Sequence, residues 1–299
     1  MTGYRNGFCR RNGPTMHDAR QLGRFFRDFV ASIRLFRIWG FLAVNDLRVR
    51  FARSRLGFGW IFLSFAVWAG GVGLVYARLF ELDATEFVPY LTIGFAIWGY
   101  LTSSIVESAN AFIIAAGYIK QFNLPKQVYV WRAILSQAIT LGLTLIICVA
   151  VLLMLRPQAL ATSYLAIPGL VLLLLAGASH AFLFAYITPY VRDLPHAASS
   201  ALNVVFFLTP IIFPAKLLRS RGLDILFSAN PFYYLIEGVR FPLLNDTLAE
   251  PGIYLGAATY IAVLAAFSAV VCGKLDRRIV YALSVTWPSG WKASTSNIH

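Results

Sequence analysis

Ionisable residues inside apolar stretches are the first candidates for chemistry, because a charged group in hydrocarbon is costly and by default suggests function. His180 stands in such a stretch, and Glu107 lies directly at the end of one, toward the cytoplasmic end of the predicted second helix. Glu107 either lines a polar pathway or pairs with Arg132, which opens the next apolar stretch. His180 has no acidic neighbour on its own helix, so a hydrogen bond to a nearby polar group is the simpler role for it, and a proton relay is the alternative.

Recognisable enzyme motifs are absent from the sequence. It contains no H-E-x-x-H, no Gly-x-Ser-x-Gly and no G-x-x-x-x-G-K-[ST] phosphate loop. Cys9, Cys148 and Cys272 are too far apart for a metal site, and two of them lie in apolar stretches. We therefore expect no catalytic residue, no metal and no cofactor bound by this chain. An acidic group at 81–86 resembles a catalytic loop, but solvated acidic residues are the simpler interpretation.

The composition places most of the chain in a membrane. Of 299 residues, 59% are hydrophobic and 13% are charged, against about 45–50% and about 25% in soluble domains. Six apolar runs approach or exceed the roughly 20 residues that a membrane-spanning helix needs, and so many buried core helices would lack a polar covering. The runs are Leu56–Ala77, Phe87–Val106, Ala133–Leu155, Tyr164–Val191, Leu194–Ala215 and Pro251–Gly273. The predicted fold is an all-α integral membrane protein with six transmembrane helices over 56–275.

The distribution of Lys and Arg predicts the orientation. Twenty of the 26 basic residues fall in alternate segments that include both ends of the chain, and six fall in the others. The positive-inside rule then puts both termini in the cytoplasm, with a cytoplasmic tail over 276–299. The net charge of +13 is therefore assigned to membrane topology, and we expect no nucleic-acid partner. The Arg-rich N-terminus does not resemble a cleaved signal.

The N-terminal region divides into two parts. Residues 1–19 are polar and basic, which predicts a disordered tail. Over 20–55, apolar residues recur at helical spacing with arginines on the other face. This pattern is typical of a helix lying in the membrane interface among lipid headgroups, or of a solvated helix that packs on a partner subunit.

Two connections between runs have unusual sequences. In the first, around Ile119–Trp131, Pro125 disfavours helical geometry at Leu124 and predicts a bent cytoplasmic segment. It is either an ordinary loop or a docking point for a soluble partner. The second follows the fifth run, with a basic stretch from Lys216 and then an aromatic stretch from Asn230. It predicts two re-entrant half-helices between the fifth and sixth spans, or an amphipathic hairpin on the outer surface. Within it, Glu237 and Arg240 are spaced to pair on one helical face.

Several stretches in order resemble the membrane subunits of type-2 ABC polysaccharide exporters, the O-antigen, capsule and teichoic-acid group. They are RVRFARSRLGFGW from Arg48, IKQFNLPKQVYVW from Ile119, RDLPH from Arg192, FFLTPIIFP from Phe206 and NPFYYLIEGVR from Asn230. The resemblance covers about 20–278. It implies a homodimer in the bacterial inner membrane, two copies of a separate ATPase that hold ATP and Mg²⁺, and a lipid-linked polysaccharide as cargo.

The resemblance also implies site residues. Coupling to the ATPase falls on Lys120, Gln121, Phe122, Asn123, Leu124, Pro125 and Lys126. The cytoplasmic mouth, where guanidinium groups suit a lipid phosphate, comprises Arg48, Arg50, Arg53 and Arg55, which are otherwise a plain basic loop. The external half-helix contains Asn230, Pro231, Glu237 and Arg240. Aromatic residues that suit a sugar conduit, or else face lipid, are Trp60, Trp68, Trp98, Tyr100, Phe206, Phe207, Tyr233 and Tyr234.

Two other functions remain open from the sequence. A type-2 ABC permease for a drug or a small lipid shares the fold, but we expect fewer aromatic residues along its pathway. A membrane-embedded glycosyltransferase needs a catalytic carboxylate or histidine in a loop, for which Glu81, Asp83 and Glu86 are the candidates.

Overall fold

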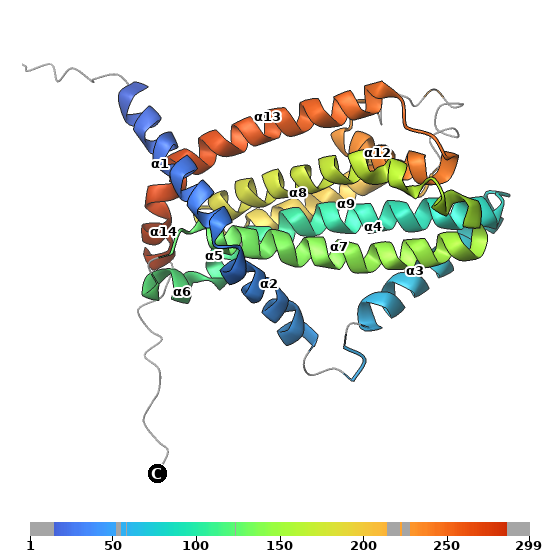
Figure 1. Cartoon of the computed structure of the whole chain (residues 1–299), viewed down its shortest axis with the longest axis horizontal. Helices are drawn as coiled ribbons and strands as arrows, with labels where there is room; N and C mark the ends of the chain where they lie inside the picture. The colour runs from blue at the N-terminus through green and yellow to red at the C-terminus, as the bar shows by residue number, and fades with distance from the viewer. Residues whose placement is uncertain are drawn as a thin grey trace, which may run out of the picture.

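The computed structural model describes residues 15–51, 55–57, 59–122, 124–213, 222 and 228–285 (Figure 1). Every regular element in these ranges is helical. The helices are α1 (Thr15–Arg34), α2 (Phe36–Phe51), α3 (Gly59–Leu79), α4 (Ala84–Ala109), α5 (Ala111–Ile114), α6 (Ala116–Gln121), α7 (Gln127–Leu155), η1 (Pro157–Leu160), η2 (Ser163–Ala166), α8 (Ile167–Ile187), α9 (Leu194–Leu208), α12 (Pro231–Asn245), α13 (Pro251–Leu275), η3 (Asp276–Arg278) and α14 (Ile279–Val285).

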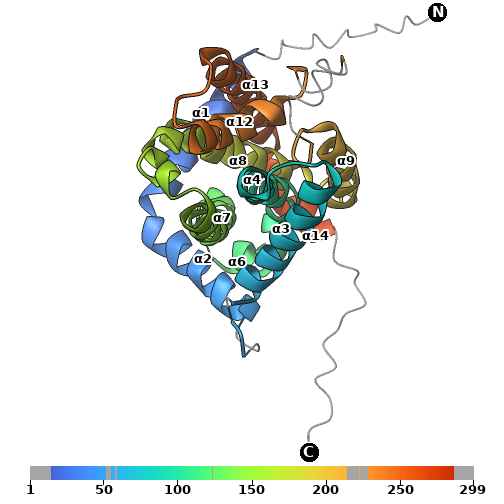
Figure 2. The same ribbon diagram turned by 90° about the vertical axis from the view of Figure 1, so that its right-hand side faces the viewer.

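Helix α4 is the centre of the bundle. It packs against α3, α7, α8, α9 and α12, and the end-on view shows it among these helices (Figure 2). Its residues Leu91, Ile93, Ile97 and Leu101 are fully buried. Small residues on α8 let its neighbours approach closely, because a Cβ on Gly177 would lie 2.1 Å from the Tyr100 hydroxyl. The all-α fold is therefore organised around one buried helix.

Four helical segments are long and apolar enough to cross a membrane: Gly59–Leu79, Gln127–Leu155, Ser163–Ile187 and Pro251–Leu283. The chain is thus a multi-pass membrane protein. The other two predicted spans correspond to α4, which contains Glu86, Pro89 and Glu107, and to α9, whose 15 residues cover only about 22 Å. Six spans therefore stay a prediction.

The two ends of the bundle differ in their helices. At one end, on the left in Figure 1, α5, α6 and α14 gather beside α1. A separate hydrophobic cluster holds this end together, and it includes Phe25 of α1, Phe112 of α5, Tyr186 of α8 and Ile279 of α14. The α3–α4 turn and α12 lie at the other end (Figure 1). Residues 276–285, predicted as part of a tail, thus form η3 and α14 and pack into the bundle.

The single predicted N-terminal helix over 20–55 is two helices in the structure. α1 begins at Thr15 and the chain breaks at Leu35, before α2. The Ser32 carbonyl accepts hydrogen bonds from Leu35 N at 3.1 Å and from Trp39 Nε1 at 3.2 Å. These bonds stand where the regular helical bond from residue 36 would be, so the α-helical pattern is interrupted at Leu35. The predicted disordered tail falls largely on residues outside the described ranges.

The connection before the last span contains one described helix, α12. It packs against α4, α8 and α13, and it is therefore covered by protein. It ends at Asp246, whose positive φ of 58° is a left-handed conformation. The first predicted half-helix lies mostly outside the described residues, so the re-entrant pair stays a prediction.

We predict that the Gly169→Ala variant destabilises the fold. A Cβ at Gly169 of α8 would lie 2.1 Å from the carbonyl oxygen of Gly238 in α12. Forcing these backbones apart should cost about 1–3 kcal/mol and lower the melting temperature in detergent. Gly142→Ala is the matched control, because a methyl group at this position would meet nothing within 4 Å. Equal melting temperatures for the two variants would contradict the close contact between α8 and α12.

Candidate functional site

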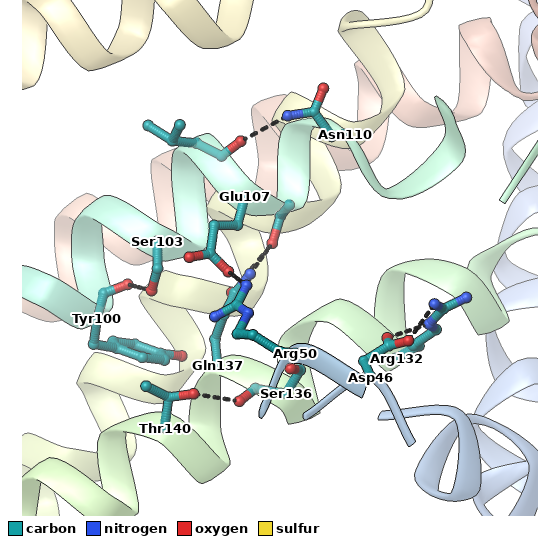
Figure 3. Close-up of polar contacts among 12 residues, drawn as sticks. Asp46, Arg50, Tyr100, Ser103, Glu107, Asn110, Arg132, Ser136, Gln137 and Thr140 are labelled. Carbon is teal, nitrogen blue, oxygen red and sulfur yellow. Dashed lines mark hydrogen bonds and ion pairs between the residues drawn. The ribbon is translucent and has the colours of Figure 1, made fainter. Parts of the chain in front are cut away.

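Two ion pairs join the surface helix α2 to the bundle, and we call Asp46, Arg50, Glu107 and Arg132 the α2 junction (Figure 3). Arg132 of α7 contacts both carboxylate oxygens of Asp46 through Nε and Nη2. Arg50 Nη2 lies 2.9 Å from Glu107 Oε2 at the end of α4. The predicted alternative of a Glu107–Arg132 pair is therefore wrong, because α2 supplies a separate partner to each of the two residues.

Packing explains why α2 presents these side chains. Ala43 and Leu47 of α2 are buried, and α2 packs along α7. Asp46 and Arg50 are four residues apart, so they share one helix face, next to the face that contains buried Ala43 and Leu47. This i, i+4 spacing would by itself suggest a pair between Asp46 and Arg50, whereas the partners of both residues lie far away along the chain.

The two pairs differ in their exposure to solvent. The side chains of Arg132 and Asp46 are 15% and 34% exposed, whereas those of Arg50 and Glu107 are 50% and 45% exposed. Bidentate geometry and partial burial make the first pair a firm attachment of α2 to α7. The second is a surface ion pair, of a kind that contributes little to stability and is screened by salt.

The arginines of the predicted mouth lie on the surface around this junction. Arg48, Arg50 and Arg55 are all exposed, and Arg53 lies outside the described residues. Phe41 and Val49 of α2 are also exposed, at 70% and 66%. The surface of α2 thus places guanidinium groups beside apolar side chains, an arrangement that fits an amphiphile with an anionic head.

The predicted conduit aromatics fall into three groups in the structure. Tyr100 and Tyr233 are buried within the chain, where they present no ring face to a passing molecule. Trp98 and Phe206 are partly buried and pack against each other, with ring centroids 5.6 Å apart, and Tyr234 is also partly buried. The exposed rings are Trp60 and Trp68 of α3 and Phe207 of α9.

An open recess lies on the α3 surface. It has a volume of about 450 Å³ and is lined by Trp60, Ile61, Ser64, Phe65, Trp68 and Thr144. Only Ala69, Gly73 and Ala77 of α3 are buried, and they form one narrow stripe. The two exposed tryptophans therefore stand on a helix surface that its own chain leaves largely uncovered.

The predicted coupling segment divides into exposed and internal residues. Lys120, Gln121 and Phe122 are exposed on and after α6, Leu124 and Pro125 are half-buried, and Asn123 lies outside the described residues. Lys126 points inward instead. Its Nζ lies 3.4 Å from Asp276 Oδ2 and also contacts the Asp276 carbonyl, while the Tyr186 hydroxyl donates to Asp276 Oδ1 at 2.9 Å. Lys126 thus joins the start of α7 to the end of α13.

The predicted pairing of Glu237 with Arg240 on α12 is confirmed. The Arg240 side chain is fully buried, contacts Glu237, donates to the Pro210 carbonyl at 2.9 Å and lies 3.8 Å from the Tyr90 ring centroid. Asn230 caps α12 through Phe232 N at 3.0 Å, and Pro231 occupies the first helical position. These residues fasten α12 to α4 and to the end of α9.

Two further candidates have structural partners. His180 Nε2 lies 2.7 Å from the Tyr260 hydroxyl, which confirms a hydrogen bond to a polar neighbour. Asp83 accepts a hydrogen bond from Thr85 N at 2.9 Å and caps α4. That bond lowers the pKa of the Asp83 carboxyl, so the carboxylate is ionised at the helix N-terminus. A capping role accounts for Asp83 without catalysis.

Residues 39–244 match the family model described as ABC-2 type transporter. The chain belongs to this family. The matched region begins within α2 and ends within α12, so it contains the α2 junction, the coupling segment and the Arg240 contacts. The chain is thus the membrane subunit of a transporter, as the resemblance indicated.

Three curated proteins of known name are similar to this chain. An O-antigen export system permease protein RfbA from Myxococcus xanthus is 25% identical over 235 residues, covering 76% of this chain and 88% of that protein. Two Klebsiella pneumoniae proteins of the same name are each 22% identical and cover 72% of this chain and 83% of their own length. The similarity extends over most of this ABC-2 permease.

We predict different effects for the two lysines of the coupling segment. Lys126→Met leaves Asp276 without its cation and should cost this permease about 1–3 kcal/mol, lowering its melting temperature by several degrees. Lys120→Met is the matched control, since Lys120 is exposed and should leave the melting temperature unchanged while weakening capture of an ATPase. If Lys120→Met lowered the melting temperature and Lys126→Met did not, the structural role would belong to Lys120 and not to Lys126.

We also predict strong coupling between Glu237 and Arg240. Glu237→Gln leaves a fully buried guanidinium without its counter-charge, at a cost of about 3–5 kcal/mol. The double variant Glu237→Gln, Arg240→Met removes both charges and should recover much of the loss in a thermal-unfolding measurement. A double variant as unstable as the sum of the two single variants would contradict a directly interacting pair.

Proposed function

We propose that this permease is the membrane subunit of an ATP-driven exporter of lipid-linked polysaccharide, such as an O-antigen or capsule-like glycan. It works as a homodimer in the bacterial cytoplasmic membrane, with both termini in the cytoplasm. Two copies of a separate subunit bind ATP and Mg²⁺ and hydrolyse the ATP. The names of the relatives support the cargo, and membership in the ABC-2 family supports the ATPase partner.

The surface of α2 is the observation that supports this cargo most. Exposed Arg48 and Arg50 flank exposed Val49, and exposed Phe41 lies about two helical turns earlier on α2. A lipid-linked glycan has a phosphate or pyrophosphate next to a long hydrocarbon tail, and it matches both parts of this surface. Guanidinium groups bind phosphate in a bidentate manner. The cargo is thus received at α2 by its lipid phosphate.

The glycan then passes between the two copies of the chain. The α3 surface is mostly uncovered, and it places Trp60 and Trp68 beside the recess. Aromatic faces contact the apolar C–H faces of sugars without fixing one register, which suits a sliding polymer. Phe207 of α9 adds a third exposed ring. The α6 segment, with Lys120, Gln121 and Phe122 exposed, docks the ATPase and transmits its movement.

Deletion of the gene in its own host tests this function. We predict that surface glycan is lost and that lipid-linked glycan accumulates on the cytoplasmic side, measured by extraction of inner-membrane lipids. A variant with Glu81→Gln and Glu86→Gln should restore export fully, because the proposed function gives these exposed residues no part in transport.

Other outcomes separate the alternatives. If no lipid-linked glycan is made at all, the chain acts in synthesis, as a glycosyltransferase would. If surface glycan is unchanged, the cargo is a different amphiphile, such as a drug or a small lipid, and the proposed polysaccharide is wrong.

A further inference from the structure

The Arg50–Glu107 pair places a carboxylate in the position that an incoming anion would occupy. Glu107 Oε2 accepts a hydrogen bond from Arg50 Nη2 at 2.9 Å. Both side chains are about half exposed, so the pair can open without unpacking any part of the bundle. An exposed pair of this kind is only weakly favoured over the separated charges.

The neighbouring Asp46–Arg132 pair behaves differently. Arg132 is only 15% exposed and contacts both oxygens of Asp46. Opening of the outer pair therefore leaves α2 attached to α7. The inner pair is the fixed attachment, and the outer pair is the one that a ligand can exchange.

The ligand that displaces Glu107 must be a stronger partner for a guanidinium than a carboxylate. A phosphomonoester or pyrophosphate has a higher charge and more acceptor oxygens, and it can engage several of the five N–H donors of Arg50. Exposed Val49 and Leu56 lie on either side in sequence and offer an apolar surface for a hydrocarbon tail. A bulk phosphodiester lipid has a single negative charge and competes less well.

We propose that Glu107 is a built-in competitor that holds Arg50 in the absence of cargo and sets its selectivity for lipids with a phosphomonoester or pyrophosphate head over bulk anionic lipids. This inference rests on the proposed function, because it assigns a selectivity residue to the same mouth. Displacement of Glu107 also frees the cytoplasmic end of α4 from α2. Capture of the lipid head is thereby coupled to release of one helix contact.

A double-mutant cycle in vesicles tests the competitor. The full chain is reconstituted with its ATPase subunit in phosphatidylcholine vesicles, and binding of farnesyl pyrophosphate is measured by titration, with farnesol as the uncharged control. Because exposed ion pairs favour the closed form by factors of roughly 1.5–5, Glu107→Gln should tighten binding about two- to sixfold. Arg50→Gln should weaken binding and abolish the effect of Glu107→Gln.

Matched variants distinguish the specific Arg50–Glu107 contact from the effect of changing the protein's net charge. Glu86→Gln removes the same charge at the opposite end of α4, and Arg27→Gln removes an exposed cation from α1. Both should leave the affinity unchanged. Adding phosphatidylglycerol to the vesicles should compete with farnesyl pyrophosphate more strongly in Glu107→Gln than in the wild type, because the bulk lipid then meets an unoccupied Arg50.

The outcomes distinguish this inference from the proposed function. If Glu107→Gln tightens binding equally with and without Arg50, or does not tighten it at all, Glu107 is not a competitor for Arg50. If the wild type binds farnesyl pyrophosphate no better than farnesol, the lipid-phosphate mouth itself is absent, and both proposals for α2 fail.

Discussion

Hydrocarbon offers no hydrogen-bond partner, so polar groups inside the bundle depend on the chain itself for their partners. The fully buried Arg240 shows this pressure: its Nη2 bonds Glu237 and the Pro210 carbonyl, its charge faces the Tyr90 ring, and its Nε and Nη1 have no hydrogen-bond partner among the described residues. Because these partners come from α12, the end of α9 and α4, the contacts of one cation join three segments at one end of the molecule. At the other end, Lys126, Asp276 and Tyr186 join α7, α13 and α8 by the same requirement.

At the α2 junction, water and lipid headgroups can also supply hydrogen-bond partners, so the need for partners within the chain is weaker there. The Asp46–Arg132 pair is partly buried and bidentate, so it attaches α2 firmly to α7. One turn further along α2, Arg50 is half exposed, and its bond to Glu107 is exchangeable. Since α2 also exposes Phe41 and Val49, a phosphate and a hydrocarbon chain can be accommodated together. Of the two ion pairs, Asp46–Arg132 thus has a structural role, and Arg50–Glu107, nearer the proposed mouth, is the exchangeable one.

The sequence predicted those features that depend on local spacing. Long apolar runs located α3, α7, α8 and α13, and the three-residue spacing on α12 located the Glu237–Arg240 pair. The isolated position of His180 correctly indicated a hydrogen-bonded histidine. Features set by distant packing were missed: Glu107 and Arg132 each pair with α2, 57 and 86 residues away along the chain. Lys126 points to Asp276, 150 residues further along the chain.

The proposed export depends on the α2 surface receiving the lipid part of the cargo. A photo-activatable residue at Val49, beside Arg48 and Arg50, tests it directly in membranes that contain radiolabelled lipid-linked glycan. Met154 of α7, which is 83% exposed at the opposite end, is the matched control for contact with bulk lipid. We expect strong glycan-lipid labelling at position 49, weak labelling at 154, and loss of the difference in Arg50→Gln. Equal labelling at the two positions in the wild-type background would contradict it.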